Sequence, residues 1–104
     1  GSFGEDHAAY KARGFVEAGV PTPEQTGWAL MAMLTANGCV TESADRAAGY
    51  LMKNQNPAGF WYSEVFTGGG LEDFWSLRYH LYPTIFGLWA LAWYKIVKEG
   101  KPLP

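Results

Sequence analysis

The sequence predicts an all-α fold, and three observations support that prediction. Thr22-Pro23-Glu24-Gln25 has the residue types of a helix start, and Asn37-Gly38 has those of a helix end. Apolar residues over 44–51 recur at positions i, i+3, i+4 and i+7, the spacing that places them on one face of a helix. An apolar stretch over 83–98 is framed by proline and glycine. We therefore expect a helical hairpin over about 22–55 and a long last helix.

The first 21 residues carry weaker signals. Residues 1–6 resemble a loop, residues 7–13 are expected to form a short helical turn, and residues 14–21 an extended connector. Gly1-x-Phe3 is compatible with the tail of a preceding repeat, whereas Gly1-Ser2 is equally compatible with a cloning remnant. Both interpretations stay open.

The first long helix is expected from Pro23 to about Ala36. Thr22 is its predicted N-cap, Glu24 suits the positive end of the helix dipole, and Gln25 completes a capping box. Large apolar residues fall within one broad stripe, and alanines between them permit close approach of another helix. The stripe consists of Trp28, Leu30, Met31 and Leu34.

The second helix is expected to begin at Thr41–Ser43 and to end at Gln55. The turn Asn56-Pro57-Ala58-Gly59 follows and delivers Phe60 and Trp61. A primary amide at a helix end can bond backbone groups on two sides. We therefore predict that Gln55 bonds backbone at a neighbouring helix or loop end, and that Trp61 packs over that link.

Residues 62–72 contain Gly68-Gly69-Gly70 and are expected to form a loop, because three glycines offer no side chain to pack. A phosphate cradle is disfavoured, since no Lys-Ser/Thr follows the glycines. The last helix should run from Pro83 to about Lys98. Its apolar residues cover nearly the whole circumference, so burial on several sides is expected.

Composition excludes several classes of protein. The chain has 104 residues with 48% hydrophobic and 16% aromatic content, which excludes disorder and leaves more rings than a small core houses. A net charge of -2 without a basic stripe argues against nucleic-acid binding. Cys39, His7 and His80 give neither a disulfide framework nor an expected zinc site, and Cys39 is interpreted as a buried, inert thiol. The apolar run 85–94 is shorter than the roughly 18 to 20 residues of a membrane-spanning helix.

The segment 71–82 is the candidate for chemistry. Its large side chains have two interpretations: an ordinary core, the usual place of aromatic residues, or a wall of ring faces that stabilises cations without offering a nucleophile. These residues are Leu71, Trp75, Leu77, Tyr79 and Tyr82.

The repeat at 46–61 resembles the "QW" repeat of the triterpene cyclases. Its matching residues are Arg46, Tyr50, Leu51, Gln55, Gly59 and Trp61. Further motifs are similar, in order, to the C-terminal end of squalene-hopene cyclases: Gly-x-aromatic-Gly-Glu-Asp at 1–6, Thr-Pro-x-Gln-Thr-x-Trp-Ala-Leu at 22–30, Phe-Thr-Gly-x-Gly at 66–70, Leu-Arg-Tyr-x-x-Tyr at 77–82 and Leu-Trp-Ala-Leu-Ala-x-Tyr at 88–94.

The resemblance implies an α/α-toroid (α/α-barrel), terpenoid cyclase-like, of which the 104 residues are an incomplete C-terminal segment. It implies cyclisation of squalene through cations in an aromatic cavity, with no metal or organic cofactor. Carried over by position, the cavity lining is Leu71, Trp75, Leu77, Tyr79 and Tyr82. Leu71 and Trp75 stand where the family usually has phenylalanines, so product identity is in doubt, and Gly87 replaces a common proline.

The resemblance also implies what this chain lacks. The family protonates squalene with an Asp-x-Asp-Asp motif, whereas Asp6, Asp45 and Asp73 form no such arrangement. The chain alone is therefore expected to be inactive and soluble in the cytoplasm, with the remainder of the cyclase chain and a squalene-like isoprenoid as partners. The intact enzyme is expected to sit peripherally on the cytoplasmic membrane, and a homodimer is compatible with the resemblance, which leaves the oligomeric state open.

Two alternatives remain. One is an autonomous helical module that stacks exposed Trp and Tyr on sugars or lipids. The other is a different α/α-toroid enzyme, which would need zinc ligands or a positioned carboxylate pair.

Overall fold

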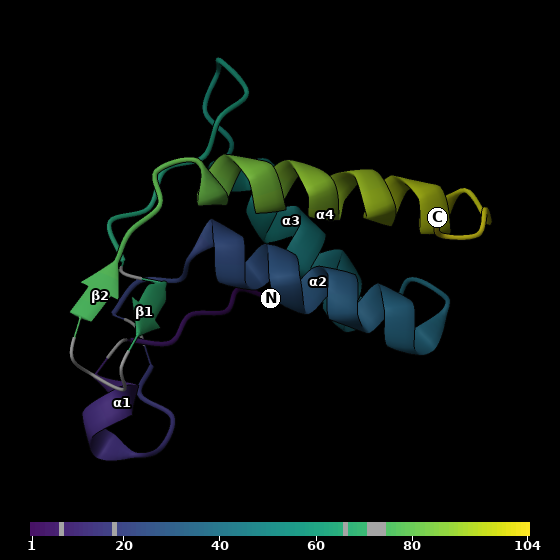
Figure 1. The fold of residues 1–104 in the computed structure, drawn as a ribbon. Coiled ribbons are helices and arrows are strands. Elements are labelled where there is room, and N and C mark those ends of the chain that lie inside the picture. Colours follow the sequence, from purple (N-terminus) through teal and green to yellow (C-terminus); the bar gives the residue numbers. More distant parts are fainter. Residues whose placement is uncertain (7, 18, 66, 71–74) are drawn as a thin grey trace.

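The computed structural model describes residues 1–6, 8–17, 19–65, 67–70 and 75–104. Its elements in chain order are α1 (Ala9–Ala12), α2 (Pro23–Asn37), α3 (Glu42–Asn54), β1 (Gly68–Gly70), β2 (Trp75–Leu77) and α4 (Tyr82–Lys98). The three long helices lie together, and α1 with the short β1–β2 ladder sits at one end of them (Figure 1). The predicted helical fold is confirmed, and each long helix begins and ends within two residues of its expected bounds.

Capping explains the bounds of α2. The Thr22 hydroxyl accepts a hydrogen bond from the Gln25 backbone N–H at 3.2 Å and donates to Gln25 Oε1 at 2.9 Å. The Thr22 backbone N–H does not donate to the Gln25 side chain, because it donates to the Phe3 carbonyl at 2.9 Å. Gly38 ends the helix with φ 64°, and its N–H donates to the Leu34 carbonyl. The start and the stop were therefore predicted correctly, but Gln25 instead bonds the backbone of Glu5.

Helix α3 begins where the Thr41 hydroxyl accepts the Ala44 N–H at 3.2 Å, as the sequence predicted. Helix α4 carries Pro83 in its first turn and is followed by Gly100 with φ 76°.

The predicted loop over the three glycines is wrong. Gly68–Gly70 forms strand β1, which pairs antiparallel with β2 in the register Gly68↔Leu77 and Gly70↔Trp75. Glycine disfavours a strand on its own, but the facing strand supplies partners for its backbone N–H and C=O groups. Near the N-terminus, Glu5 and Glu17 form an isolated antiparallel bridge around α1.

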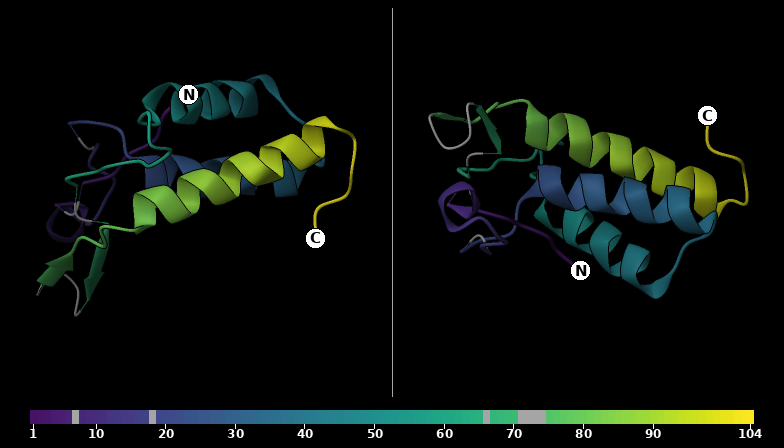
Figure 2. Two further views of the ribbon diagram at one scale, coloured as in Figure 1. Left: turned by 90° about the horizontal axis from the view of Figure 1, so that it is seen from above. Right: turned by 60° about the horizontal axis from the view of Figure 1, so that its bottom comes forward.

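Helix α2 lies between α3 and α4, and it packs most extensively on α4 (Figure 2). The core is made of small and aliphatic side chains with one indole: Leu30, Leu34, Ala44, Ala47, Ala48, Leu51, Trp61 and Ala90. Gly27 brings α2 and α4 into backbone contact, since a Cβ placed there would meet the Phe86 carbonyl oxygen at 2.6 Å.

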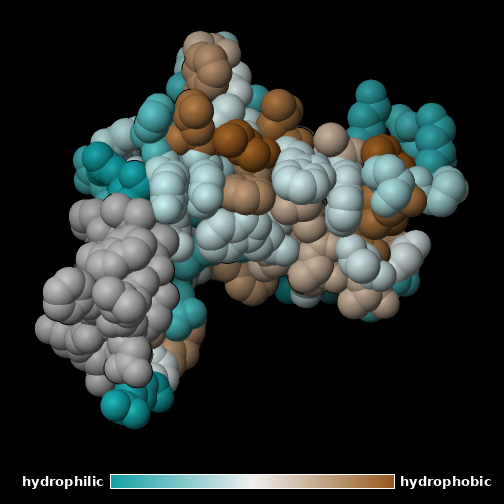
Figure 3. All heavy atoms as spheres, in the orientation of Figure 1, coloured by the Kyte–Doolittle hydropathy of each residue, from teal (hydrophilic) through white to brown (hydrophobic). Residues whose placement is uncertain are grey.

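Two burial predictions are wrong. Helix α4 buries Pro83, Gly87 and Ala90 on one side only, while Leu88 and Trp89 are 58% and 48% exposed. Hydrophobic side chains accordingly gather over α4 along the upper edge of Figure 3. Cys39 is exposed rather than buried, because it follows the helix-ending Gly38 in the tight connection to α3.

Candidate functional site

The turn after α3 is organised by Asn56. Its side-chain Oδ1 accepts hydrogen bonds from the N–H groups of Ala58 and Phe60, and its backbone N–H donates to the Phe60 carbonyl. Gly59 takes the left-handed conformation with φ 92°, which glycine adopts without strain. The exposed Gln55 donates from Nε2 to the Gly59 carbonyl at 3.0 Å. Gln55 therefore bonds the loop that follows it, and none of its hydrogen bonds within the described residues reaches a neighbouring helix.

Trp61, and not Gln55, connects the turn to the helices. Its side chain is 3% exposed, and its indole N–H donates to the Leu51 carbonyl at 2.8 Å. Leu51 lies in the last turn of α3, whose carbonyls have no partner inside the helix. The indole ring also lies against Gly87 of α4, where a Cβ would stand 3.0 Å from Cδ2. The glycine at this position thus makes room for the ring.

Thr84 holds the backbone of Trp61, a contact that sequence reasoning missed. The Trp61 N–H donates to Thr84 Oγ1 at 3.1 Å, and the same hydroxyl donates to the Trp61 carbonyl at 3.2 Å. Thr26 makes the same pair of bonds with Phe3, at 3.0 and 3.3 Å. In both cases 23 residues separate the aromatic residue from the threonine. The sequence signal that could have predicted this contact is the repeated spacing of 23 residues between the aromatic residue of a Gly-x-aromatic motif and a threonine.

The other residues of the predicted repeat lie on α3. Arg46 is exposed and donates to Glu42 Oε1 at 2.7 Å, and Gly1 lies against its backbone. The Tyr50 hydroxyl donates to the Pro21 carbonyl at 3.2 Å. This face of α3 therefore holds the segments that run on either side of α1.

The predicted cavity-lining residues are described in part. Leu71 lies outside the described residues, as does Asp73, and Trp75 and Leu77 are placed by their backbone in β2. Tyr79 and Tyr82 come together as a stacked pair, with ring centroids 4.4 Å apart and planes at 25°. Tyr79 is 42% exposed.

The Tyr79–Tyr82 pair continues into a file of rings along α4. Tyr82 meets Phe86 edge to face at 5.2 Å, Phe86 stacks with Trp89 at 6.1 Å, and Trp89 meets Trp93 at 6.1 Å. Positions 82, 86, 89 and 93 lie on one stripe of the helix. Trp28 of α2 contacts the Phe86 ring edge to face at 5.2 Å. We call Tyr79, Tyr82, Phe86, Trp89 and Trp93 the aromatic file, and its ring faces can stabilise a cation without supplying a nucleophile.

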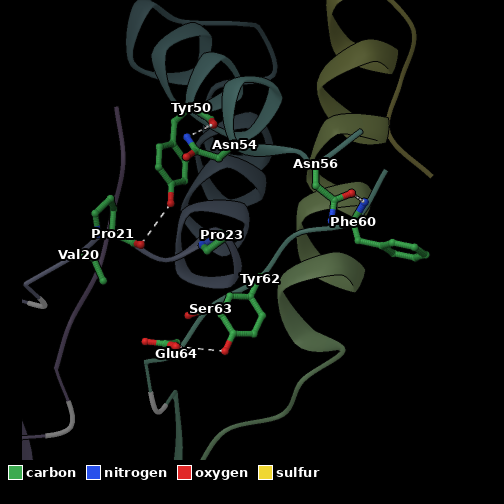
Figure 4. A pocket seen from close by; sticks show the side chains of 10 residues that line it. All are labelled: Val20, Pro21, Pro23, Tyr50, Asn54, Asn56, Phe60, Tyr62, Ser63 and Glu64. Atoms are coloured by element: carbon green, nitrogen blue, oxygen red, sulfur yellow. Dashed lines mark hydrogen bonds between the residues drawn. The ribbon is translucent and has the colours of Figure 1, made fainter. Parts of the chain in front are cut away.

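A pocket of about 500 Å³ lies between α2, α3 and the segment after Trp61 (Figure 4). The hydroxyls of Tyr50 and Tyr62 face Pro21 and Glu64, and both hydrogen bonds are drawn. The Asn56 side chain is used by its own turn. The hydroxyls of Tyr50 and Tyr62 and the Asn56 side chain are therefore already bonded within the chain.

Glu24 is the buried acid of this end of the molecule. Its side chain is 1% exposed in the first turn of α2. Burial raises its pKa, and this outweighs the opposing effects of its own backbone N–H and of the Thr67 and Ser63 hydroxyls. The pKa of Tyr50 is also raised, first by burial and then by the Glu24 charge.

Asp45 has the opposite environment at the far end of α3 and α4. The Tyr94 hydroxyl donates to its carboxylate and lowers its pKa, with a further effect from Lys98. Lys98 Nζ in turn donates to the Tyr94 hydroxyl at 2.7 Å. Among the described residues, no group of three His, Cys, Asp or Glu could hold a metal, and no helix has the length and apolarity needed to span a membrane.

Comparison with known proteins identifies the family. Residues 1–96 match the family model described as squalene-hopene cyclase C-terminal domain. A squalene-hopene cyclase of Alicyclobacillus acidocaldarius is 37% identical over 98 residues, covering 94% of this chain and 16% of the relative. A squalene-hopene cyclase of Bradyrhizobium diazoefficiens is 38% identical over 101 residues, covering 95% of this chain and 15% of the relative. A dammaradiene synthase of Dryopteris crassirhizoma is 36% identical over 100 residues, covering 91% and 15%.

The chain thus spans less than a fifth of the length of these curated relatives. The match nevertheless covers nearly all of the chain, and its helices are those expected for part of an α/α toroid. The chain belongs to the squalene-hopene cyclase C-terminal domain family.

Proposed function

We propose that this chain forms part of the wall of a cavity in which a triterpene cyclase holds its carbocations. The substrate is squalene or a related linear isoprenoid, and the product is a polycyclic triterpene. The observation that carries the proposal is the stacked pair Tyr79–Tyr82 at the start of α4, in which Tyr79 is partly exposed. The names of the relatives, squalene-hopene cyclase and dammaradiene synthase, support this substrate class.

The chemistry needs neutral π faces near a desolvated cation. Each face contributes roughly 1 to 2 kcal/mol to such a cation. Every 1.36 kcal/mol changes a rate by about tenfold. Tyr79 and Tyr82 offer such ring faces. The wall therefore stabilises the carbocations that form late in the cyclisation, so that fewer of them lose a proton or react with water before the last ring closes.

The initiating proton comes from the remainder of the cyclase chain. Protonating an alkene needs a strong acid that still carries its proton. Asp45 is ionised at neutral pH, since the Tyr94 hydroxyl lowers its pKa. Glu24 retains its proton more readily, but a raised pKa makes it a weaker acid. The chain alone is expected to be inactive.

The test replaces Tyr79 by Leu and by Phe in the full-length enzyme, with squalene as substrate. Leu removes the ring face, and Phe keeps the face while losing the hydroxyl. We expect Tyr79→Leu to lower turnover by about tenfold and to release incompletely cyclised products, because a cation loses one face. Tyr79→Phe should keep the product pattern.

Tyr62→Leu is the matched control, because Tyr62 is 70% exposed and bonds only Glu64 among the described residues. Products are separated and quantified by gas chromatography with mass detection. An unchanged product pattern and rate in Tyr79→Leu would contradict the assignment and make the aromatic file an ordinary packing feature.

A further inference from the structure

Glu24 and Thr67 contain two buried oxygens that need a partner. Glu24 Oε2 and Thr67 Oγ1 are both shielded from solvent, and neither has a hydrogen-bond partner within the described residues. A buried polar atom is ordinarily bonded, so each such atom requires an explanation. Here the two atoms lie in the same place, because the Thr67 hydroxyl is one of the groups that act on the Glu24 carboxyl.

The surroundings of Glu24 contain no counter-charge in the described part of the chain. The groups that act on its carboxyl are its own backbone N–H and the hydroxyls of Thr67 and Ser63. The titratable group beside it is Tyr50 of α3, whose hydroxyl donates to the Pro21 carbonyl. A carboxylate without a cation is disfavoured in such a place, whereas a neutral carboxyl is not.

A proton on Glu24 would make each of the two oxygens a possible partner of the other. The neutral carboxyl carries one O–H donor, and Thr67 Oγ1 has free acceptor lone pairs. In the ionised state the Thr67 hydroxyl could donate to the carboxylate instead, which lowers the pKa, but burial is the larger effect. The neutral acid is therefore the form that suits this site.

We propose that Glu24 is a positioning residue, which as the neutral acid holds Thr67, and with it the β1–β2 ladder, against the first turn of α2. Thr67 directly precedes β1, and Gly68 pairs with Leu77 of β2. The ladder thus fixes the backbone of Trp75 and Leu77. The role of these two residues as cavity lining rests on the proposed function.

The contact between Glu24 and Thr67 is expected to weaken as pH rises. The pKa of Glu24 in the folded chain is raised above its ordinary value of 4.5. The contribution of Glu24 is therefore fully present below about pH 4.5 and is lost as pH rises through the folded pKa. Ionisation leaves a buried charge without a counter-charge among the described residues, and we expect the contact with Thr67 to open so that water reaches the carboxylate.

The test is hydrogen–deuterium exchange of the full-length protein from about pH 4.5 to about pH 8, read from peptides that span 67–70 and 75–77. Rates are converted to protection factors, so that the intrinsic effect of pH on exchange is removed. In the wild type we expect protection of the ladder to fall as pH rises, by at most about tenfold per pH unit, the limit for one proton. Glu24→Gln should abolish this slope, because a primary amide has the shape of the neutral acid and does not ionise.

Glu64→Gln is the matched control, since Glu64 is exposed and lies one residue from Ser63. It should keep the wild-type slope. If Glu24→Gln keeps the slope, or lowers protection by the same factor at every pH, Glu24 has only a structural role and the inference is overturned. Thr67→Val should lower protection at acid pH and Thr67→Ser should restore it; equal protection in both would also overturn it.

The outcome is independent of the proposed function. Exchange reports on the ladder whether or not the enzyme turns over squalene. If the protein fails to cyclise squalene but Glu24→Gln abolishes the slope, the proposed function is refuted and the positioning role stands. If cyclisation is found and the slope persists in Glu24→Gln, the positioning role is refuted alone.

Discussion

The contact between α2 and α4 at Gly27 gives the sharpest prediction on stability. Gly27→Ala would place a methyl group 2.6 Å from the Phe86 carbonyl oxygen and 2.9 Å from its carbon. Both atoms belong to the backbone of α4, so no side-chain rotation relieves the clash. The helices must move apart, and overpacking of this kind costs about 1 to 3 kcal/mol.

Gly49→Ala is the matched control, because Gly49 also lies inside a helix but meets nothing within 4 Å. Alanine is more favourable than glycine in a helix interior by about 0.8 to 1 kcal/mol. The same gain applies at Gly27, so we expect Gly27→Ala to lower the free energy of unfolding by up to about 2 kcal/mol. Gly49→Ala should raise it by up to about 1 kcal/mol.

Urea unfolding of this chain, followed by circular dichroism at 222 nm, measures both values with one method. Opposite signs for the two variants are the expected result. If Gly27→Ala is as stabilising as Gly49→Ala, the helices do not approach as closely as described, and the account of the core is wrong.

Two further predictions concern the turn and the acid sensitivity of the fold. Trp61→Phe should lower the free energy of unfolding by about 1 to 3 kcal/mol, because it leaves the Leu51 carbonyl unpaired, whereas Gln55→Ala should cost about 0.5 to 1.5 kcal/mol for one exposed bond. Equal losses in urea unfolding would contradict this order. Asp45 has a lowered pKa, so its stabilising contribution is present above its ordinary value of 3.8 and is lost as pH falls through the folded value. Urea midpoints of Asp45→Asn and the wild type should therefore converge at acid pH, and a constant gap would refute the assignment.

The parts of the fold that the sequence predicts are those with a local cause. Thr22 caps the N–H of Gln25 three residues away. Gly38 ends α2 in a left-handed conformation, which glycine adopts readily after the last turn of a helix. Such interactions are complete within one turn of chain. They define the bounds of the helices without the help of a tertiary contact.

The parts that were missed depend on distant segments. Three glycines carry no side-chain pattern, so the pairing of Gly68 with Leu77 leaves no periodic signal. The apolar circumference of α4 predicted burial on several sides, but periodicity cannot tell which faces have a neighbour. Of the candidate site, the sequence alone was enough to name Tyr79 and Tyr82 as candidates. Their stacking, and the contact of Tyr82 with Phe86, became known only once α4 was placed.

The turn after α3 and the candidate cavity wall both contact the first turns of α4. Thr84 clamps the backbone of Trp61, and it lies two residues after Tyr82 in the first turn of the helix. One turn further on, Gly87 supports the Trp61 ring. The start of α4 is therefore fixed from the turn side, while Tyr79 and Tyr82 stack at the same helix end. A change that displaces Trp61 should consequently shift Tyr82 as well as destabilise the core, because Trp61 bonds both α3 and the first turn of α4.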